Sequence, residues 1–159
     1  MLMVPVPSIR NSKFEIRNIR AEDLEALYRL DAMCFEPGIA YSRQQLREFL
    51  GIPSAEGVLA ESAGELAGFA LGYRSRGGAG HVVTLDVHPR ERRRGLGKTL
   101  LEDLLSRLSR AGARRAGLEV AVENLGAIAF YESLGFQARR RLPDYYATGR
   151  AALEMEKGL

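Results

Sequence analysis

The chain has 159 residues, of which 46% are hydrophobic and 27% are charged, and its formal net charge at pH 7 is +3. This length suits one domain with a packed core, and no apolar run approaches the roughly 20 residues that a membrane-spanning helix needs. The single cysteine, Cys34, excludes a disulfide within the chain and favours a cytoplasmic protein in which Cys34 is a buried apolar residue.

The first third of the chain predicts a strand followed by two helices. Residues 1–12 are too short and too rich in proline for a signal peptide, so we expect a flexible tail ahead of a domain at 13–157. Residues 13–19 alternate between apolar and polar, which is typical of a strand. Apolar residues at helical spacing predict a helix over 20–35, and Ser42 is expected to cap a second helix that runs to Leu50.

The middle of the chain predicts a hairpin and then a central strand. Residues 57–62 and 66–73 are expected to be strands, because the short segment 63–65 between them suits a tight turn. After a glycine-rich connection, residues 81–89 are rich in β-branched and apolar residues, and Pro89 ends the strand because it has no N–H for a sheet.

The remaining elements complete a mixed sheet. Leucines at helical spacing predict a helix from Leu96 to Arg110, followed by a strand over 114–122, a helix over 124–134 and strands over 136–142 and 151–156. The expected fold class is a single-domain α/β mixed sheet of order β-α-α-β-β-β-α-β-α-β-β. In such sheets, ligands bind beyond the carboxyl ends of the parallel strands.

A basic, glycine-containing turn joins the central strand to the long helix. Gly95 and Gly97 allow a ligand to approach the backbone, and the helix start offers unpaired N–H groups. Together with the arginines of residues 92–94, this predicts a phosphate or pyrophosphate site; the alternative is a solvated basic turn. The spacing fits neither a Walker loop nor the complete dinucleotide fingerprint, since position 100 is Leu. The histidines and the lone cysteine form no recognisable ligand pattern, so no metal is expected.

Two segments resemble the GCN5-related N-acetyltransferase (GNAT) superfamily. The first is Arg92-x-x-Gly95-x-Gly97 after a strand ending in Val87-His88-Pro89, which resembles the family's acetyl-CoA signature. The second runs from Leu118-Glu119-Val120 to Tyr131-Glu132-Ser133-Leu134-Gly135-Phe136, and it resembles the branch that acetylates protein N-termini, above all the bacterial ribosomal-protein-alanine N-acetyltransferases. The resemblance spans residues 13–157 and implies the GNAT fold.

The resemblance implies that acetyl-CoA is the co-substrate. Backbone groups of residues 85–87 are expected to bind its pantetheine arm, with the Val87 N–H on the thioester carbonyl, while the side chain of Asp86 orients a neighbour. Asn124 is expected to cap its helix, to contact the cofactor, or both. The complete expected cofactor-binding set is Leu85, Asp86, Val87, Arg92, Arg93, Arg94, Gly95, Leu96, Gly97, Lys98, Asn124 and Tyr131.

Two residues are the candidates for catalysis. Glu119 is an acidic residue on a central strand, which is costly unless it faces a cavity or a partner. This pattern leaves open whether Glu119 is a general base or forms an ion pair with an arginine such as Arg17 or Arg115. Tyr131 is the candidate acid for the departing thiolate, the alternative being a core tyrosine; both catalytic roles are implied by the resemblance.

The acceptor side is expected to include Tyr41, Tyr145 and Tyr146, with exposed loop aromatics as the alternative. The loop differs from the N-terminal acetyltransferase pattern in having no acidic residue between Tyr146 and Glu154. The leading interpretation is an N-acetyltransferase for a protein N-terminus, with ribosomal proteins among the candidate acceptors. We expect it to have no DNA or membrane partner and to be a monomer or weak dimer.

Three other functions compete with this interpretation. A GNAT enzyme of this kind could instead acetylate a small-molecule amine or a lysine side chain. A different class is a non-catalytic acyl-CoA-binding module. A nucleic-acid binder would use the arginine runs, although residues 139–141 are expected to be a solvated sheet edge, with an acidic peptide or ribosomal RNA as the alternative contact.

Overall fold

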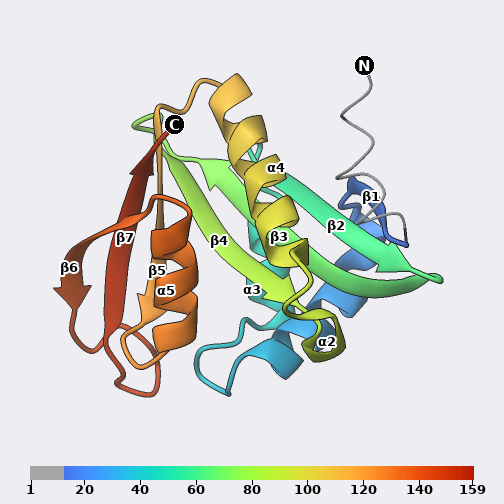
Figure 1. Ribbon diagram of the computed structural model, residues 1–159, viewed down its shortest axis with the longest axis horizontal. Coiled ribbons are helices and arrows are strands. Elements are labelled where there is room, and N and C mark those ends of the chain that lie inside the picture. The colour runs from blue at the N-terminus through green and yellow to red at the C-terminus, as the bar shows by residue number, and fades with distance from the viewer. Residues whose placement is uncertain (1–12) are drawn as a thin grey trace.

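The computed structural model describes residues 13–159, so the tail expected at 1–12 lies outside the described residues. Seven strands form one mixed sheet in the order β1-β2-β3-β4-β5-β7-β6, as Figure 1 shows. The strands are β1 (Glu15–Asn18), β2 (Glu56–Ser62), β3 (Glu65–Arg74), β4 (Gly80–Val87), β5 (Arg115–Ala121), β6 (Gln137–Leu142) and β7 (Ala152–Gly158). The helices are α2 (Leu24–Cys34), α3 (Arg43–Leu50), α4 (Leu96–Arg110) and α5 (Leu125–Ser133), with 3₁₀ turns η1 (Ala21–Asp23) and η2 (Pro89–Glu91).

The expected fold class and element order are confirmed, and the local signals account for most boundaries. Ser42 caps α3, because its hydroxyl accepts from the Gln45 N–H at 3.1 Å. Ala63 and Gly64 take the positive φ angles of +53° and +80° that a tight hairpin turn requires. The first strand is shorter than expected: β1 begins at Glu15 because its pairing with β2 begins there.

Strands β4 and β5 lie together at one end and part at the other, as Figure 1 shows. Within residues 13–159 their parallel register consists of Gly80 with Ala116 and His81 with Gly117. Beyond this point β4 follows β3 as far as Val87, whereas β5 follows β7 as far as Ala121. Each strand is held by its outer neighbour, so a gap opens between their carboxyl ends.

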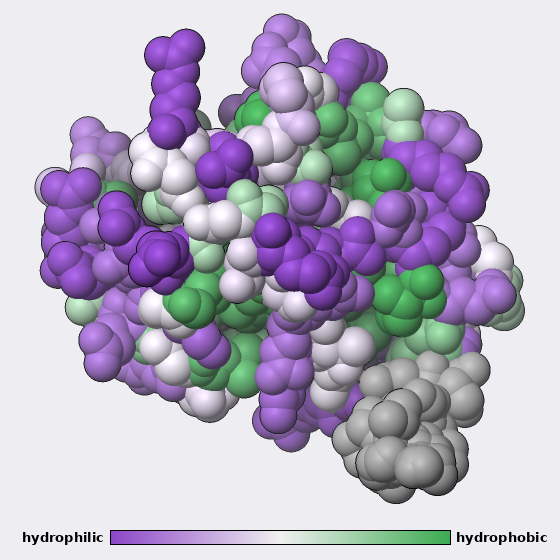
Figure 2. Space-filling model, turned by 90° about the horizontal axis from the view of Figure 1, so that it is seen from above, coloured by the Kyte–Doolittle hydropathy of each residue, from purple (hydrophilic) through white to green (hydrophobic). Residues whose placement is uncertain are grey.

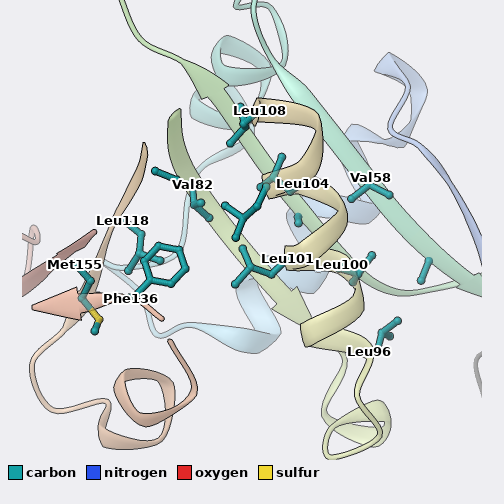
Figure 3. Packing of buried hydrophobic residues seen from close by; sticks show 14 of the residues in the cluster. Val58, Val82, Leu96, Leu100, Leu101, Leu104, Leu108, Leu118, Phe136 and Met155 are labelled. Carbon is teal, nitrogen blue, oxygen red and sulfur yellow. The ribbon is translucent and has the colours of Figure 1, made fainter. Parts of the chain in front are cut away.

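Two apolar clusters cover the two faces of the sheet. Figure 3 shows the leucines of α4, among them Leu100, Leu104 and Leu108, packed beside Val58 and Val82, with Phe136 nearby. The opposite face carries α2 and α3, whose Leu27 and Leu46 are completely buried. Burying a leucine stabilises the folded state by roughly 1.5–3 kcal/mol, so both clusters stabilise the sheet that carries the gap.

The surface view in Figure 2 shows hydrophobic residues in separate patches among hydrophilic ones. Scattered apolar residues of this kind are ordinary on protein surfaces. Among residues 13–159, no helix combines the length and the apolar character that crossing a membrane would demand.

Candidate active site

A pocket of about 930 Å³ occupies the gap where β4 and β5 part. Its lining includes residues 82–85 and Val87 of β4, residues 118–121 of β5, and residues from the start of α4, from α5 and from the loops that precede α3 and β7. The pocket is therefore reached from both faces of the sheet. A ligand in it would meet the edge of β4, which lacks a strand partner here within the described chain.

The basic turn forms one end of this pocket. Arg93 and Gly95 adopt positive φ angles of +66° and +83°, and α4 begins immediately afterwards at Leu96. The first N–H groups of a helix have no acceptor within it and attract anions. Gly97 and Lys98 line the pocket, whereas Leu96 is buried in the core and can contribute its backbone. The turn thus combines backbone donors with cationic side chains, as expected for a phosphate site.

The other arginines of the turn have partners within the protein. The Nε of Arg92 donates to the Val87 carbonyl at 3.0 Å, which ties the turn to the end of β4. Arg94 is well exposed and lies 3.8 Å from Glu91. The guanidinium of Arg92 thus braces the turn, and both Arg92 and Arg93 line the pocket.

Glu119 lies in the pocket beside a residue that sequence reasoning did not single out. Its Oε1 is 2.8 Å from Nε2 of His81. The expected alternative of an ion pair with Arg17 or Arg115 is wrong. Arg17 pairs with Asp23 and Glu61, and Arg115 pairs with Glu156.

Tyr131 reaches the same pocket from the opposite face of the sheet. It packs on α5 between Phe130 and Phe136, with ring centroids 5.3 Å and 5.7 Å away. Burial, and to a smaller extent the charge of Asp86, raises the pKa of the Tyr131 phenol above its ordinary value. Tyr131 therefore keeps its proton at neutral pH and can donate it. The pocket places a proton acceptor, Glu119, and a proton donor on opposite sides of one gap.

The three tyrosines expected at the acceptor site lie on the same side of the pocket as Glu119. The hydroxyl of Tyr41 donates to the Val83 carbonyl at 3.2 Å, and its ring meets Phe49 edge-on. Tyr145 and Tyr146 contact one another with centroids 4.9 Å apart, and Tyr146 lines the pocket. Burial raises the pKa of each of these two phenols to about 12, with the carboxylate of Glu119 as a further cause. Burial raises the pKa of the Tyr41 phenol as well, so all three keep their protons at neutral pH. Tyr145 is 47% exposed, which agrees with the alternative of an exposed loop aromatic.

The loop between α2 and α3 contacts the loop before β7 at the mouth of the pocket. Local sequence signals did not predict this contact. Arg150, before β7, lies 3.2 Å from the carboxylate of Glu36, after α2. A Cβ added to Gly38 would lie 2.5 Å from a side-chain carbon of Thr148, so the two loops touch there. The contacting residues are far apart in the chain, which explains why spacing did not reveal the contact.

Two further expectations concern Asn124 and Cys34. The side chain of Asn124 accepts from the Ala127 N–H at 3.1 Å, which confirms that it caps α5, and Asn124 also lines the pocket. Cys34 is less buried than expected, because it too lines the pocket. Burial raises the pKa of its thiol to about 11, so it is protonated and a poor nucleophile. Between residues 13 and 159, no His, Cys, Asp and Glu cluster is suited to a metal ion.

Comparisons with known proteins give one family match over most of the chain. Residues 24–136 match the model of the acetyltransferase (GNAT) family. An N-acetyltransferase of Methanocaldococcus jannaschii, MJ1530, is 31% identical over 89% of this chain and 90% of its own length. An N-alpha-acetyltransferase of Sulfurisphaera tokodaii is 28% identical over 92% of this chain and 93% of its own length.

Solved structures show the same architecture. The ribosomal-protein-S18-alanine N-acetyltransferase of Escherichia coli has a TM-score of 0.81 and 27% identity, over 91% of this chain and 93% of the other. Naa50 of Arabidopsis thaliana, in complex with the bisubstrate analogue CoA-Ac-MVNAL, has a TM-score of 0.78 and 22% identity, over 92% of this chain and 99% of the other. At 22% identity, the similarity to Naa50 shows a shared fold only.

Proposed function

This chain belongs to the acetyltransferase (GNAT) family and is an N-acetyltransferase with acetyl-CoA as co-substrate, and from that premise we propose that it acetylates the N-terminal α-amine of a protein. Family membership sets aside the non-catalytic binding module considered from the sequence. The observation that carries the proposal is Glu119, a carboxylate that lines the pocket and is held there by His81.

The pocket fits acetyl-CoA in shape and in chemistry. The edge of β4 over residues 82–87 can pair with an extended pantetheine arm, as a strand would. The turn at residues 93–98 supplies backbone donors and cations for the diphosphate. We assign the cofactor-binding roles to the backbone of residues 85–87, to this turn, and to Asn124 and Tyr131 at the pocket wall.

The reaction needs a proton removed on one side and supplied on the other. Bound acetyl-CoA supplies an acetyl thioester. Glu119 accepts the proton of the acceptor amine, directly or through one water, and His81 keeps its carboxylate oriented. Tyr131, protonated at neutral pH, donates its proton to the departing sulfur. The N–H of Val87 stabilises the negative charge that develops on the thioester oxygen.

An α-amine is the acceptor that this base suits. An α-amino group has a pKa of about 7.7–8.0, so roughly a fifth to a third of it is already neutral at about pH 7.4. A lysine side chain, with a pKa of about 10.4, is neutral in only about one molecule in a thousand. A single carboxylate such as Glu119 is therefore sufficient to deprotonate an α-amine. A lysine side chain would need an environment that lowers its pKa by several units.

The mouth of the pocket supports an extended peptide entering beside Glu119. Tyr41, Tyr145 and Tyr146 provide apolar rings with hydroxyls that can bind a backbone. The carboxylate of Glu123 lies at the pocket as well, and negative charge attracts a protonated amine. A ribosomal protein is one acceptor of this class, and the cytoplasm, favoured by the cysteine content, is the proposed place of action.

The test is a pair of peptides that differ in the amine they offer. One peptide has a free N-terminus beginning with Ala, Ser, Thr or Met, and the other has the same sequence with a blocked N-terminus and an internal lysine. We expect acetyl-CoA-dependent acetylation of the free α-amine, located by mass spectrometry. Faster acetylation of the blocked peptide, or of polyamines or aminoglycosides offered alongside, would overturn the proposal in favour of a lysine or small-molecule acceptor.

A further inference from the structure

We propose that Asp31 and Asp86 share one proton inside the protein and act as positioning residues that hold the acetyl-CoA edge of β4 against α2. The role in positioning rests on the proposed cofactor site. The shared proton does not, and it can be tested without acetyl-CoA.

The two carboxyl groups meet in the interior although they come from different elements. Asp31 lies on α2 and Asp86 on β4, and both are completely buried. The hydroxyl of Thr84 lies 2.5 Å from Oδ1 of Asp86 and 3.5 Å from Oδ1 of Asp31. Thr84 therefore marks the point where the two side chains converge.

Two of the four carboxyl oxygens of the cluster have a donor of their own. The single hydroxyl hydrogen of Thr84 is donated to Oδ1 of Asp86 at 2.5 Å, and the N–H of Tyr41 donates to Oδ2 of Asp31 at 2.7 Å, whereas Oδ1 of Asp31 lies 3.5 Å from the same hydroxyl. Oδ2 of Asp86 is buried and has no donor within the described residues. A buried carboxyl oxygen without a donor lowers the stability of the folded protein. A proton on one carboxyl group satisfies this oxygen, because the two groups can then hydrogen-bond to one another.

The charges around the pair favour the same conclusion. Arg92 acts on Asp86 only through space, and its Nε donates to the Val87 carbonyl. The charge of Asp86 also acts on Cys34 and Tyr131, and burial raises the pKa of both of these groups, so both are neutral and neither offsets that charge. Burial is the largest cause that raises the pKa of both Asp31 and Asp86, and the charge of Asp31 raises the pKa of Asp86 further. Two unpaired buried carboxylates side by side would be more costly than one shared proton.

Asp31 and Asp86 lie where they can hold the cofactor-binding edge of β4 in place. Asp86 lies between Leu85 and Val87, whose backbone is proposed to bind the thioester arm. Asp31 fixes the backbone of Tyr41, and the hydroxyl of Tyr41 binds the carbonyl of Val83 on the same strand. Loss of the shared proton would place two like charges between α2 and β4. We therefore expect the β4 edge to shift and acetyl-CoA affinity to fall.

The sign of the pH dependence follows from proton binding. In the unfolded chain both aspartates ionise near a pH of about 3.9, whereas the folded protein retains one proton well above that value. Folding therefore takes up a proton near neutral pH. Its stabilising contribution is complete below the unfolded pKa and is lost as pH rises through the folded pKa. Over this window the folding equilibrium constant falls about tenfold per pH unit because of this proton.

The first experiment measures unfolding by denaturant without acetyl-CoA, from about pH 5.5 to about pH 9. Asp86→Asn and Asp31→Asn each replace one carboxyl by an amide, whose hydrogen needs no proton uptake. Glu102→Gln, at an exposed position on α4, is the matched control. We expect the folding equilibrium constant of the wild type and of the control to fall with rising pH more steeply than that of both asparagine variants. The difference in slope should be about tenfold per pH unit. Parallel pH profiles for all four proteins would overturn the shared proton.

A second experiment needs no variant to fold. Carbon NMR of the aspartate carboxyl groups in the wild-type protein should show one that is still protonated near neutral pH. If every aspartate carboxyl is ionised there, the proposal is wrong.

The positioning role is then tested by calorimetric titration of acetyl-CoA across the same pH range. We expect affinity for the wild type to weaken at high pH relative to Asp86→Asn. An unchanged ratio between the two proteins would remove the positioning role while leaving the shared proton standing. If neither protein binds acetyl-CoA at any pH, the proposed cofactor site fails instead.

Discussion

His81 Nε2 lies 2.8 Å from Oε1 of Glu119, and this contact joins β4 to β5 where their pairing ends, since His81 is paired with Gly117, two residues before Glu119. The other ring nitrogen, Nδ1, is buried and has no partner within the described residues. A neutral imidazole with its hydrogen on Nε2 therefore fits best, because a second N–H at Nδ1 would be left without an acceptor. In this form His81 donates to the carboxylate and leaves Glu119 negatively charged, as a base must be.

Replacing the proposed base should slow the reaction strongly. Glu119→Gln keeps the size and a hydrogen-bonding group but cannot accept the amine proton. We expect kcat to fall by about 10²- to 10⁴-fold, which is the rate enhancement that a general base typically provides. The affinity for acetyl-CoA should be nearly unchanged. Steady-state kinetics at saturating acetyl-CoA measures this, with Glu102→Gln as the control. A loss below about threefold would remove Glu119 as the base.

His81 should matter through Glu119. His81→Ala removes the donor that orients the carboxylate, so we expect a smaller fall in kcat than for Glu119→Gln. In the double variant the two losses should not add, since His81 has no carboxylate left to orient. A double-mutant cycle on kcat tests this, and additive losses would show that His81 acts independently of Glu119.

Tyr131→Phe should separate catalysis from binding. The phenylalanine ring preserves the packing against Phe130 and Phe136 while removing the hydroxyl. We expect kcat to fall by at least about tenfold, as for loss of a general acid, and the acetyl-CoA dissociation constant to stay within about threefold. Turnover equal to that of the wild type would exclude Tyr131 from the mechanism.

Gly97→Leu should abolish acetyl-CoA binding. A Cβ at this position would lie 3.5 Å from a methyl of Val87 and 3.7 Å from the ring of Phe130, so a larger side chain must extend into the pocket or displace its wall. Gly77→Leu is the control, because a Cβ there meets nothing within 4 Å. Calorimetry with coenzyme A measures the loss. Normal affinity in a folded Gly97→Leu protein would contradict the assignment of the turn.

The bridge between Glu36 and Arg150 should affect the acceptor more than the cofactor. Arg150→Glu places two like charges at the mouth of the pocket, and we expect the acceptor KM to rise several-fold while the acetyl-CoA KM stays the same. Adding Glu36→Arg reverses both charges and should restore part of the loss. Exposed ion pairs contribute at most about 1 kcal/mol, which limits the effect to roughly fivefold. No recovery in the charge-swapped protein would argue against the bridge.

Local patterns in the sequence were sufficient for the elements and for one end of the site. The leucines from Leu96 onward predicted α4, and the glycines and arginines before it predicted the turn at the pocket. Glu119 and Tyr131 were identified through resemblance to a family, and the structure brings both to one pocket. These signals are readable because helices, turns and caps depend on residues within a few positions of one another.

The order of the elements, the basic turn and the acetyltransferase family can all be read along the chain. Three-dimensional packing was needed to learn that His81, rather than an arginine, holds Glu119, that Glu36 meets Arg150, and that Asp31 and Asp86 converge on one buried site. Each of these contacts joins residues far apart in the chain. They depend on the register at which β4 and β5 part and on how α2 and the loops pack over that gap, and periodicity along the chain carries no information on either.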